Sequence, residues 1–243
     1  MNCLVLFLIL FFAISGSHAA ENPFIAGGVP ASDREWIGKD YAATFQAFET
    51  GTAPLPVLED PLGKRVIQRL TNEENFGLHK NKNLPLAQRL GDYLEMQKSL
   101  ASIFKLYIAP AGEEKNLHAE QAVLMGFNLR VAALGVDLVN EFIPTIPKDD
   151  KYEIRMEGLK QMYGGLTTSF SGAESALGET KIFSENDFAV ILGAMRSTLP
   201  TLKQAFTPEY QLELEKKLSD RKEHSKGESL AALEEMIKVL KKD

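Results

Sequence analysis

The sequence predicts an all-α protein, an irregular multi-helix bundle of about seven or eight helices preceded by a cleavable signal peptide. Apolar residues recur at helical spacing over most of the chain, and the sequence has no run of alternating β-branched residues. Proline-bearing stretches at residues 50–61, 109–116 and 144–150 separate the helical segments. We therefore expect a single helical domain over residues 32–243, after a flexible segment at residues 20–31.

The N-terminus has the pattern of a secretory signal peptide. An apolar run extends from Leu4 to Ile14, and Ser17 and Ala19 then place small side chains at the two positions that define a cleavage site. The run of about 11 residues is short of the roughly 20 that a transmembrane helix needs, which disfavours the alternative of a membrane anchor. We predict cleavage after Ala19, although no Lys or Arg precedes the apolar run.

Cysteine content and net charge limit the compartment and the partners. The single cysteine, Cys3, lies before the predicted cleavage site, so the mature chain would have none and would form no disulfide. This favours a periplasmic or secreted bacterial protein over an exported eukaryotic domain. The formal net charge of −6 disfavours nucleic acid and anionic lipid as partners. After signal removal we expect no stable membrane anchor.

The first half of the chain predicts three helices. The first begins at the capping box Ser32-Asp33-Arg34-Glu35. Its apolar stripe consists of Ile37, Tyr41, Phe45 and Phe48. The second opens at Asp60-Pro61 and runs to about Thr71, because an acid caps a helix and proline fits its first position. Residues 72–83 form a polar connection, and residues 85–108 form the third helix.

The second half predicts five more helices, of which the fourth in the chain is the most apolar. Residues 117–143 are apolar around most of the circumference, so we expect this helix to be central, although its charged residues are too frequent for a membrane span. A sixth helix begins at Ser184, and Pro200 should kink or end it. The seventh starts at Thr207-Pro208 and the eighth near residues 225–228, and these two form a terminal antiparallel hairpin.

The fifth predicted helix contains the glycine-rich stretch GLKQMYGGLTTSFSG at residues 158–172. An apolar seam from Tyr152 to Leu177 passes through it at steps of three and four, and the spacing matches no phosphate-binding loop. Three glycines recur every seven residues: Gly158, Gly165 and Gly172. Two accounts remain. Either a second helix packs closely along this glycine line, or the helix breaks at Gly164-Gly165. The unbroken seam favours the first.

A second line of small residues offers a partner for those glycines. Ala119, Gly126 and Ala133 recur every seven residues in the fourth predicted helix. If they face the glycine line, replacing Gly165 with leucine should destabilise the protein by several kcal/mol.

The most notable polar residues lie on the apolar fourth helix. Arg130, Asp137 and Glu141 fall within about 40° of one another around it. They are weak candidates for a polar functional site. The alternative is that they form the one wet edge of this helix or an internal group of ion pairs.

Other motifs carry little chemistry, and we expect no catalytic residue, metal site or cofactor. The sequence has no zinc-protease helix, no Glu-x-x-His pair and no nucleophile elbow. Glu114 and His118 share a face at i, i+4, which indicates a capping or surface pair more than a metal site. Trp36 and the aromatic residues after it indicate core packing more than a stacking platform for a sugar or peptide. Residues 213–228 indicate a solvated surface or, less strongly, a partner-binding hairpin.

Two functional hypotheses follow. The first is an exported soluble helical protein that binds a protein partner or a small ligand in the bacterial cell envelope without catalysis. The second is an all-α envelope hydrolase or lyase that acts on a cell-wall polymer with an Asp or Glu as general acid. A cleft that holds a carboxyl of raised pKa would favour the enzyme, and a large exposed apolar groove would favour binding.

Overall fold

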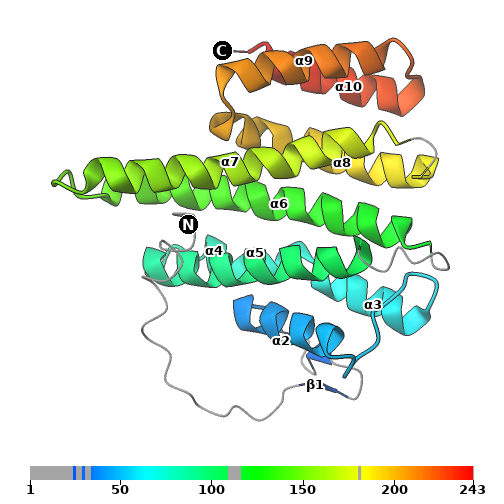
Figure 1. The fold of residues 1–243 in the computed structure, drawn as a ribbon, viewed down its shortest axis with the longest axis horizontal. Helices are drawn as coiled ribbons and strands as arrows, with labels where there is room; N and C mark the ends of the chain where they lie inside the picture. Colours follow the sequence, from blue (N-terminus) through cyan, green and yellow to red (C-terminus); the bar gives the residue numbers. More distant parts are fainter. Residues whose placement is uncertain (1–23, 26–28, 31–33, 109–115, 180–181, 243) are drawn as a thin grey trace, which may run out of the picture.

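The computed structural model describes residues 24–25, 29–30, 34–108, 116–179 and 182–242, and within these ranges the protein is a helical bundle (Figure 1). The longer helices are α2 (Gly38–Glu49), α3 (Pro61–Leu70), α5 (Leu86–Ile108), α6 (His118–Phe142), α7 (Tyr152–Ala176), α8 (Glu185–Leu202), α9 (Pro208–Lys222) and α10 (Gly227–Leu240). The predicted all-α class is confirmed.

Shorter elements complete the described part of the chain. They are the single-turn helix α4 (Gly77–Lys80), the 3-10 helices η1 (Glu73–Phe76), η2 (Ile143–Thr145) and η3 (Lys203–Ala205), and the two-residue strands β1 (Phe24–Ile25) and β2 (Val29–Pro30). The strands pair antiparallel within the segment that the sequence predicts to be flexible. The predicted signal peptide, its cleavage site after Ala19, and Cys3 lie outside the described residues.

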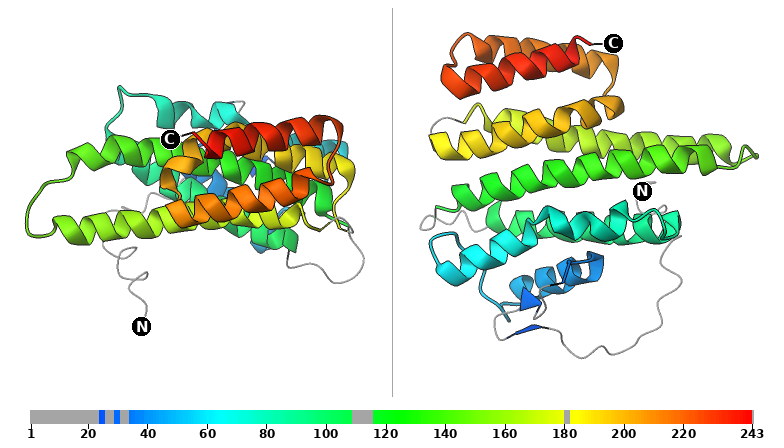
Figure 2. Two further views of the ribbon diagram at one scale, coloured as in Figure 1. Left: turned by 90° about the horizontal axis from the view of Figure 1, so that it is seen from above. Right: turned by 180° about the vertical axis from the view of Figure 1, so that it is seen from behind.

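The helices stack in layers with α6 in the middle (Figures 1 and 2). Helix α2 lies on one outer side, α3 and α5 come next, α7 lies beside α6, and the α9–α10 hairpin covers α8 on the opposite outer side. Buried apolar residues form two clusters, one on each side of α6. Leu129 and Val136 of α6 belong to the cluster with α7 to α10, whereas Phe127 and Leu138 belong to the cluster with α2, α3 and α5.

The central position predicted for residues 117–143 is therefore confirmed. Within the described part of the chain, His118–Thr145 is the helical stretch long and apolar enough to cross a membrane by length and composition. Its most apolar window is 67% buried inside the bundle. Packing against both clusters accounts for its apolar sequence, because a helix covered on several sides has little need of a polar face.

Most predicted helix ends are confirmed by their caps. Asp60 Oδ2 accepts the N–H of Gly63 at 2.7 Å before α3, and Thr207 Oγ1 accepts the N–H of Tyr210 at 3.2 Å before α9. At the start of α8, Ser184 Oγ accepts the N–H of Asp187 at 3.3 Å. Pro200 lies inside α8, which ends shortly after it, at Leu202. These side chains satisfy N–H groups that a first helical turn leaves free.

The predicted start of the first helix is wrong. Helix α2 begins at Gly38 and not at the Ser32-Asp33-Arg34-Glu35 box. The N-cap is instead Ile37, whose N–H donates to Asp40 Oδ2 at 2.9 Å, while Asp40 Oδ1 pairs with Arg34 at 2.6 Å. The N–H of Trp36 is bound to the side chain of Asn75 at 2.9 Å. This long-range bond holds Trp36 outside the helix, because an N–H given to a distant acceptor does not enter a helical ladder.

Helix α7 is continuous through Gly164-Gly165, so the alternative of a break at these glycines is wrong. The close partner helix predicted along the glycine line is also wrong, because a Cβ added at Gly165 or Gly172 would meet no atom within 4 Å. The small residue Gly126 packs against α8 and not α7: its added Cβ would lie 3.3 Å from Ala194 Cβ. The seven-residue repeat thus identified residues that share a face, but that face of α7 is open.

Replacing Gly165 with alanine is expected to raise the free energy of unfolding by about 0.5–1 kcal/mol. Alanine restricts the unfolded chain and favours the helix, and the open space at this position lets the new methyl group enter without a clash. Urea unfolding followed by circular dichroism measures the change. A loss of more than about 1 kcal/mol would contradict the open face.

Candidate functional site

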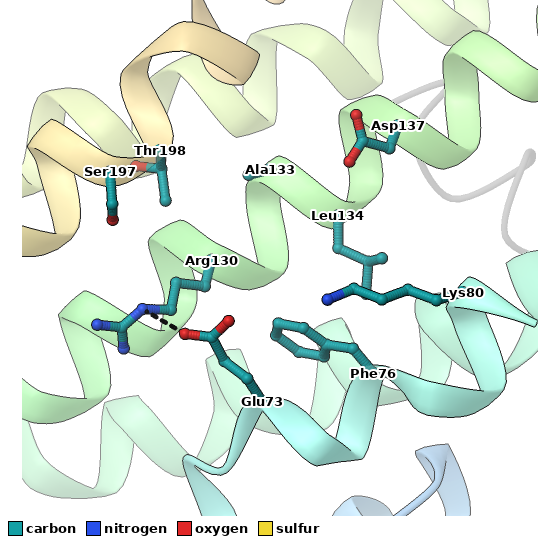
Figure 3. A pocket seen from close by; sticks show the side chains of 9 residues that line it. All are labelled: Glu73, Phe76, Lys80, Arg130, Ala133, Leu134, Asp137, Ser197 and Thr198. Atoms are coloured by element: carbon teal, nitrogen blue, oxygen red, sulfur yellow. Dashed lines mark ion pairs between the residues drawn. The ribbon is translucent and has the colours of Figure 1, made fainter.

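A surface cleft of about 210 Å³ lies where η1, α4, α6 and α8 meet (Figure 3). It is lined by Glu73, Phe76, Lys80, Arg130, Ala133, Leu134, Asp137, Ser197 and Thr198. Helix α6 supplies four of these side chains, at positions 130, 133, 134 and 137, which the helical repeat places on one face. Two of the polar residues that the sequence singled out, Arg130 and Asp137, therefore lie in the same cleft.

The apolar floor of the cleft is held in place by the core. Phe76 is only 3% exposed, and its ring stacks on Phe127 with the ring centroids 5.4 Å apart. Leu134 is 6% exposed beside it. The ammonium nitrogen of Lys80 lies 5.3 Å from the centroid of the Phe76 ring, a cation–π contact that holds this charge over the floor (Figure 3).

Arg130 supplies the second cation of the cleft. Its Nε lies 3.0 Å from Glu73 Oε1, and both side chains are partly exposed. In Figure 3 the terminal nitrogens of the guanidinium extend beyond this contact. Since an exposed pair of this kind contributes about 0–1 kcal/mol to stability, the ion pair serves mainly to orient Arg130.

Two hydroxyl residues of α8 complete the lining. Ser197 Oγ donates to the carbonyl of Ala194 at 3.0 Å, and Thr198 Oγ1 donates to the same carbonyl at 2.8 Å. In Figure 3 the Ser197 oxygen points into the cleft, whereas the Thr198 oxygen points toward its own helix and its methyl group points into the cleft. Because its proton is used within the helix, Ser197 offers a ligand an acceptor.

Asp137 has a raised pKa. Partial burial raises the pKa of its carboxyl, and the negative charge of Glu141 one turn away raises it further, while Lys80 and Lys82 oppose the shift. Asp137 is nonetheless exposed at the rim. Its carboxylate is thus available to a ligand from solvent.

Glu141, the third residue that the sequence singled out, does not line the cleft. Its Oε2 lies 2.6 Å from Arg89 Nη2, and Lys82 Nζ is 3.8 Å from Oε1. The Arg89 side chain is 5% exposed and also donates to the carbonyl of His79 at 3.0 Å. The hydrogen bond from Arg89 lowers the pKa of Glu141. The three polar residues of α6 are therefore divided: Arg130 and Asp137 line the cleft, and Glu141 forms an ion pair with α5.

Replacing Glu141 with glutamine is expected to lower the free energy of unfolding by about 1–2 kcal/mol at neutral pH, because Arg89 would remain buried without its counter-charge. The pKa of Glu141 is lowered in the folded state, so its stabilisation is present above the ordinary carboxyl pKa and is lost as the pH falls through the lowered value. The difference between the two proteins should vanish in acid. Urea unfolding across this pH range measures it, and a constant difference would contradict the ion pair.

The same substitution should also change the titration of Asp137. Without the charge of Glu141, the pKa of Asp137 should fall toward its ordinary value but stay above it, because burial is the larger cause. Carboxyl carbon chemical shifts followed by NMR across the titration report this pKa. An unchanged value would show that the two acids are not coupled.

A buried polar cluster fixes the segment that carries Phe76 and Lys80. His79 Nε2 lies 2.9 Å from Asp92 Oδ2, and the other oxygen of Asp92 accepts the N–H of Gly38 at 2.9 Å. The His79 side chain is fully buried. These contacts join α4 to α5 and α2, so they position one wall of the cleft without being accessible to a ligand.

The remaining sequence candidates do not form a site. Trp36 is fully buried and meets Tyr41 edge-on at 5.6 Å between ring centroids, so it belongs to the core and forms no stacking platform. Glu114 lies outside the described residues, and the His118 ring packs 5.7 Å from that of Phe183. Among the residues that the structure describes, no group of three or more His, Cys, Asp or Glu side chains is arranged to hold a metal ion.

Sequence reasoning missed the wall formed by η1 and α4, which it read as a polar connection. One signal was present: Lys80 follows Phe76 by four residues, the spacing at which a cation and an aromatic ring meet on a helix. Ser197 and Thr198 gave no signal, because isolated hydroxyl residues are common on helices.

Comparisons of the chain with protein-family models, with curated proteins and with solved structures found no match. What the cleft can do is therefore argued from its own residues.

Proposed function

We propose that this protein is exported to the bacterial cell envelope, where it binds a small ligand in the cleft of α6 without chemical conversion. The observation that carries the proposal is the lining itself: two cations and two carboxylates surround an apolar floor. Binding sites commonly combine apolar walls with a few convergent polar groups that fix the ligand. The signal-like N-terminus supports export.

A second candidate function is an all-α hydrolase or lyase of a cell-wall polymer with Asp137 as general acid. The raised pKa of Asp137 favours it, because a general acid must keep its proton near the working pH. Glycoside hydrolysis usually needs a second free carboxyl group. The other acid of the cleft, Glu73, is paired with Arg130, and Figure 3 places it away from Asp137. We therefore favour binding.

The test is equilibrium dialysis of the protein, purified from a periplasmic extract, against the low-molecular-weight fraction of the envelope, with mass spectrometry of what is retained. The wild-type protein should enrich a compound that the Lys80→Met and Asp137→Asn variants do not. Lys216→Met and Asp220→Asn, which change exposed residues of α9, are the matched controls. If no compound depends on Lys80 and Asp137, binding in the cleft is refuted.

The hydrolase makes the opposite prediction for the same proteins. Incubated with purified cell wall, the wild-type protein would release soluble fragments and the Asp137→Asn variant would release none. Export is tested separately by N-terminal sequencing of the periplasmic protein, which should begin at Ala20. An intact Met1 in the membrane fraction would overturn the proposed location.

A further inference from the structure

The cleft carries two cations and two carboxylates, arranged in two groups. At one end Glu73 pairs with Arg130, and Ser197 of α8 lies on the same side of the view (Figure 3). Toward the other end lie Lys80 and Asp137, with Leu134 between them (Figure 3).

These charges disfavour a ligand that carries a single charge. A simple anion would be attracted by Lys80 but would meet the carboxylate of Asp137, and a simple cation would meet the opposite conflict. One charge of the cleft is already neutralised, since Glu73 pairs with Arg130. Lys80 and Asp137 then remain as one cation and one anion, and a ligand with one carboxylate and one ammonium satisfies both.

The size and the apolar floor of the cleft narrow the class of ligand further. Its volume of about 210 Å³ is below the roughly 300–1,000 Å³ of pockets that take drug-sized molecules. The floor of the cleft is formed by the apolar side chains of Phe76, Ala133 and Leu134. A ligand that contacts Lys80, Asp137 and this floor together is small and carries an apolar group beside its two charges.

Resting on the proposed function, we infer that the cleft binds an apolar α-amino acid as the zwitterion. The carboxylate is held by Lys80, and the ammonium is held by Asp137. The side chain lies on the apolar floor. Each charged contact contributes to affinity by an amount that removal of one ligand charge can reveal.

The experiment measures binding of four probes to the full protein by isothermal titration calorimetry: leucine, leucinamide, N-acetylleucine and isocaproate. Leucinamide lacks the carboxylate, N-acetylleucine lacks the ammonium, and isocaproate has the chain and the carboxylate alone. Leucine should bind about tenfold or more tightly than each of the others, which is the effect of losing one charge-assisted hydrogen bond. Equal binding of leucine and any of these three would overturn the inference.

Variants assign each charge to its partner. Lys80→Met should lower the affinity for leucine to that of leucinamide and leave the affinity for leucinamide unchanged. Asp137→Asn should lower the affinity for leucine to that of N-acetylleucine and leave the affinity for N-acetylleucine unchanged. Lys216→Met and Asp220→Asn should change neither. If Lys80→Met lowered the affinities for leucine and leucinamide equally, the proposed contact between Lys80 and the ligand carboxylate would be refuted.

Failure of the inference is distinguishable from failure of the proposed function. If leucine does not bind while a compound from the envelope extract still depends on Lys80 and Asp137, the cleft is a binding site for another class of ligand. If neither leucine nor any component of the extract depends on these residues, both proposals are refuted.

Discussion

Replacing Asn75 with alanine should lower the free energy of unfolding by about 3–5 kcal/mol. The side chain is fully buried and makes three hydrogen bonds. Its Oδ1 accepts the N–H of Trp36 at 2.9 Å, and its Nδ2 donates at 2.9 Å both to the hydroxyl of Tyr41 and to the carbonyl of Arg69. Alanine would leave the buried N–H of Trp36 without this acceptor and remove one bond each from the Tyr41 hydroxyl and the Arg69 carbonyl. A buried unpaired polar group costs about 1–3 kcal/mol.

Urea unfolding followed by circular dichroism measures this loss, with Asn186→Ala as the control. Asn186 is exposed in the first turn of α8, so its replacement should change stability by less than about 0.5 kcal/mol. Similar losses for both variants would show that the network around Asn75 is not a main support of the fold. Because Asn75 precedes Phe76, its loss should also weaken any binding in the cleft.

Replacing Gly135 with alanine should lower the free energy of unfolding by about 1–3 kcal/mol. The new Cβ would overlap the hydroxyl of Tyr93 and lie 2.6 Å from its Cζ. Tyr93 is fully buried, so the ring can move away only by displacing its neighbours in the core. The free-energy cost of this clash exceeds the gain in helix propensity of alanine over glycine, which is about 1 kcal/mol.

The matched control is Gly165→Ala, the same substitution in α7, for which we expect a change of opposite sign. Tyr93→Phe should be neutral or stabilising on its own, because the Tyr93 hydroxyl is buried and has no hydrogen-bond partner within the described protein. Combined with Gly135→Ala it should recover part of the loss, since the nearest clashing atom is gone. Stabilisation by Gly135→Ala would contradict the close contact between α5 and α6.

Helices could be predicted from the sequence because their signals are local. The apolar seam of α7 and the caps Asp60, Ser184 and Thr207 are all readable within a few residues. The start of α2 could not be predicted in the same way, because the N–H of Trp36, two residues before it, is bound to Asn75, which lies 39 residues after Trp36 in the chain.

Close packing at glycines could not be predicted, because periodicity shows which residues share a face and not what covers it. Gly165 and Gly172 recur at regular spacing and face open space. Gly135 belongs to no such repeat and contacts Tyr93. The deciding fact is the neighbouring helix, which is a property of the tertiary structure.

The cleft could be predicted only in part. Arg130 and Asp137 stood out as charges on an apolar helix, which is a local signal. Lys80 joins them because Phe76 stacks on Phe127 of α6, while buried contacts of His79 and Asn75 tie the same segment to α5 and to Trp36. That arrangement joins residues far apart in the chain.

Because α6 contributes to both apolar clusters, the two sides of the bundle should not open independently. Loss of either cluster would expose one flank of the most apolar helix to water, so partial opening would be nearly as unfavourable as complete unfolding. In native-state hydrogen exchange, the amides in the middle of α6 should then exchange only through global unfolding, with a single cooperative thermal transition for the whole chain.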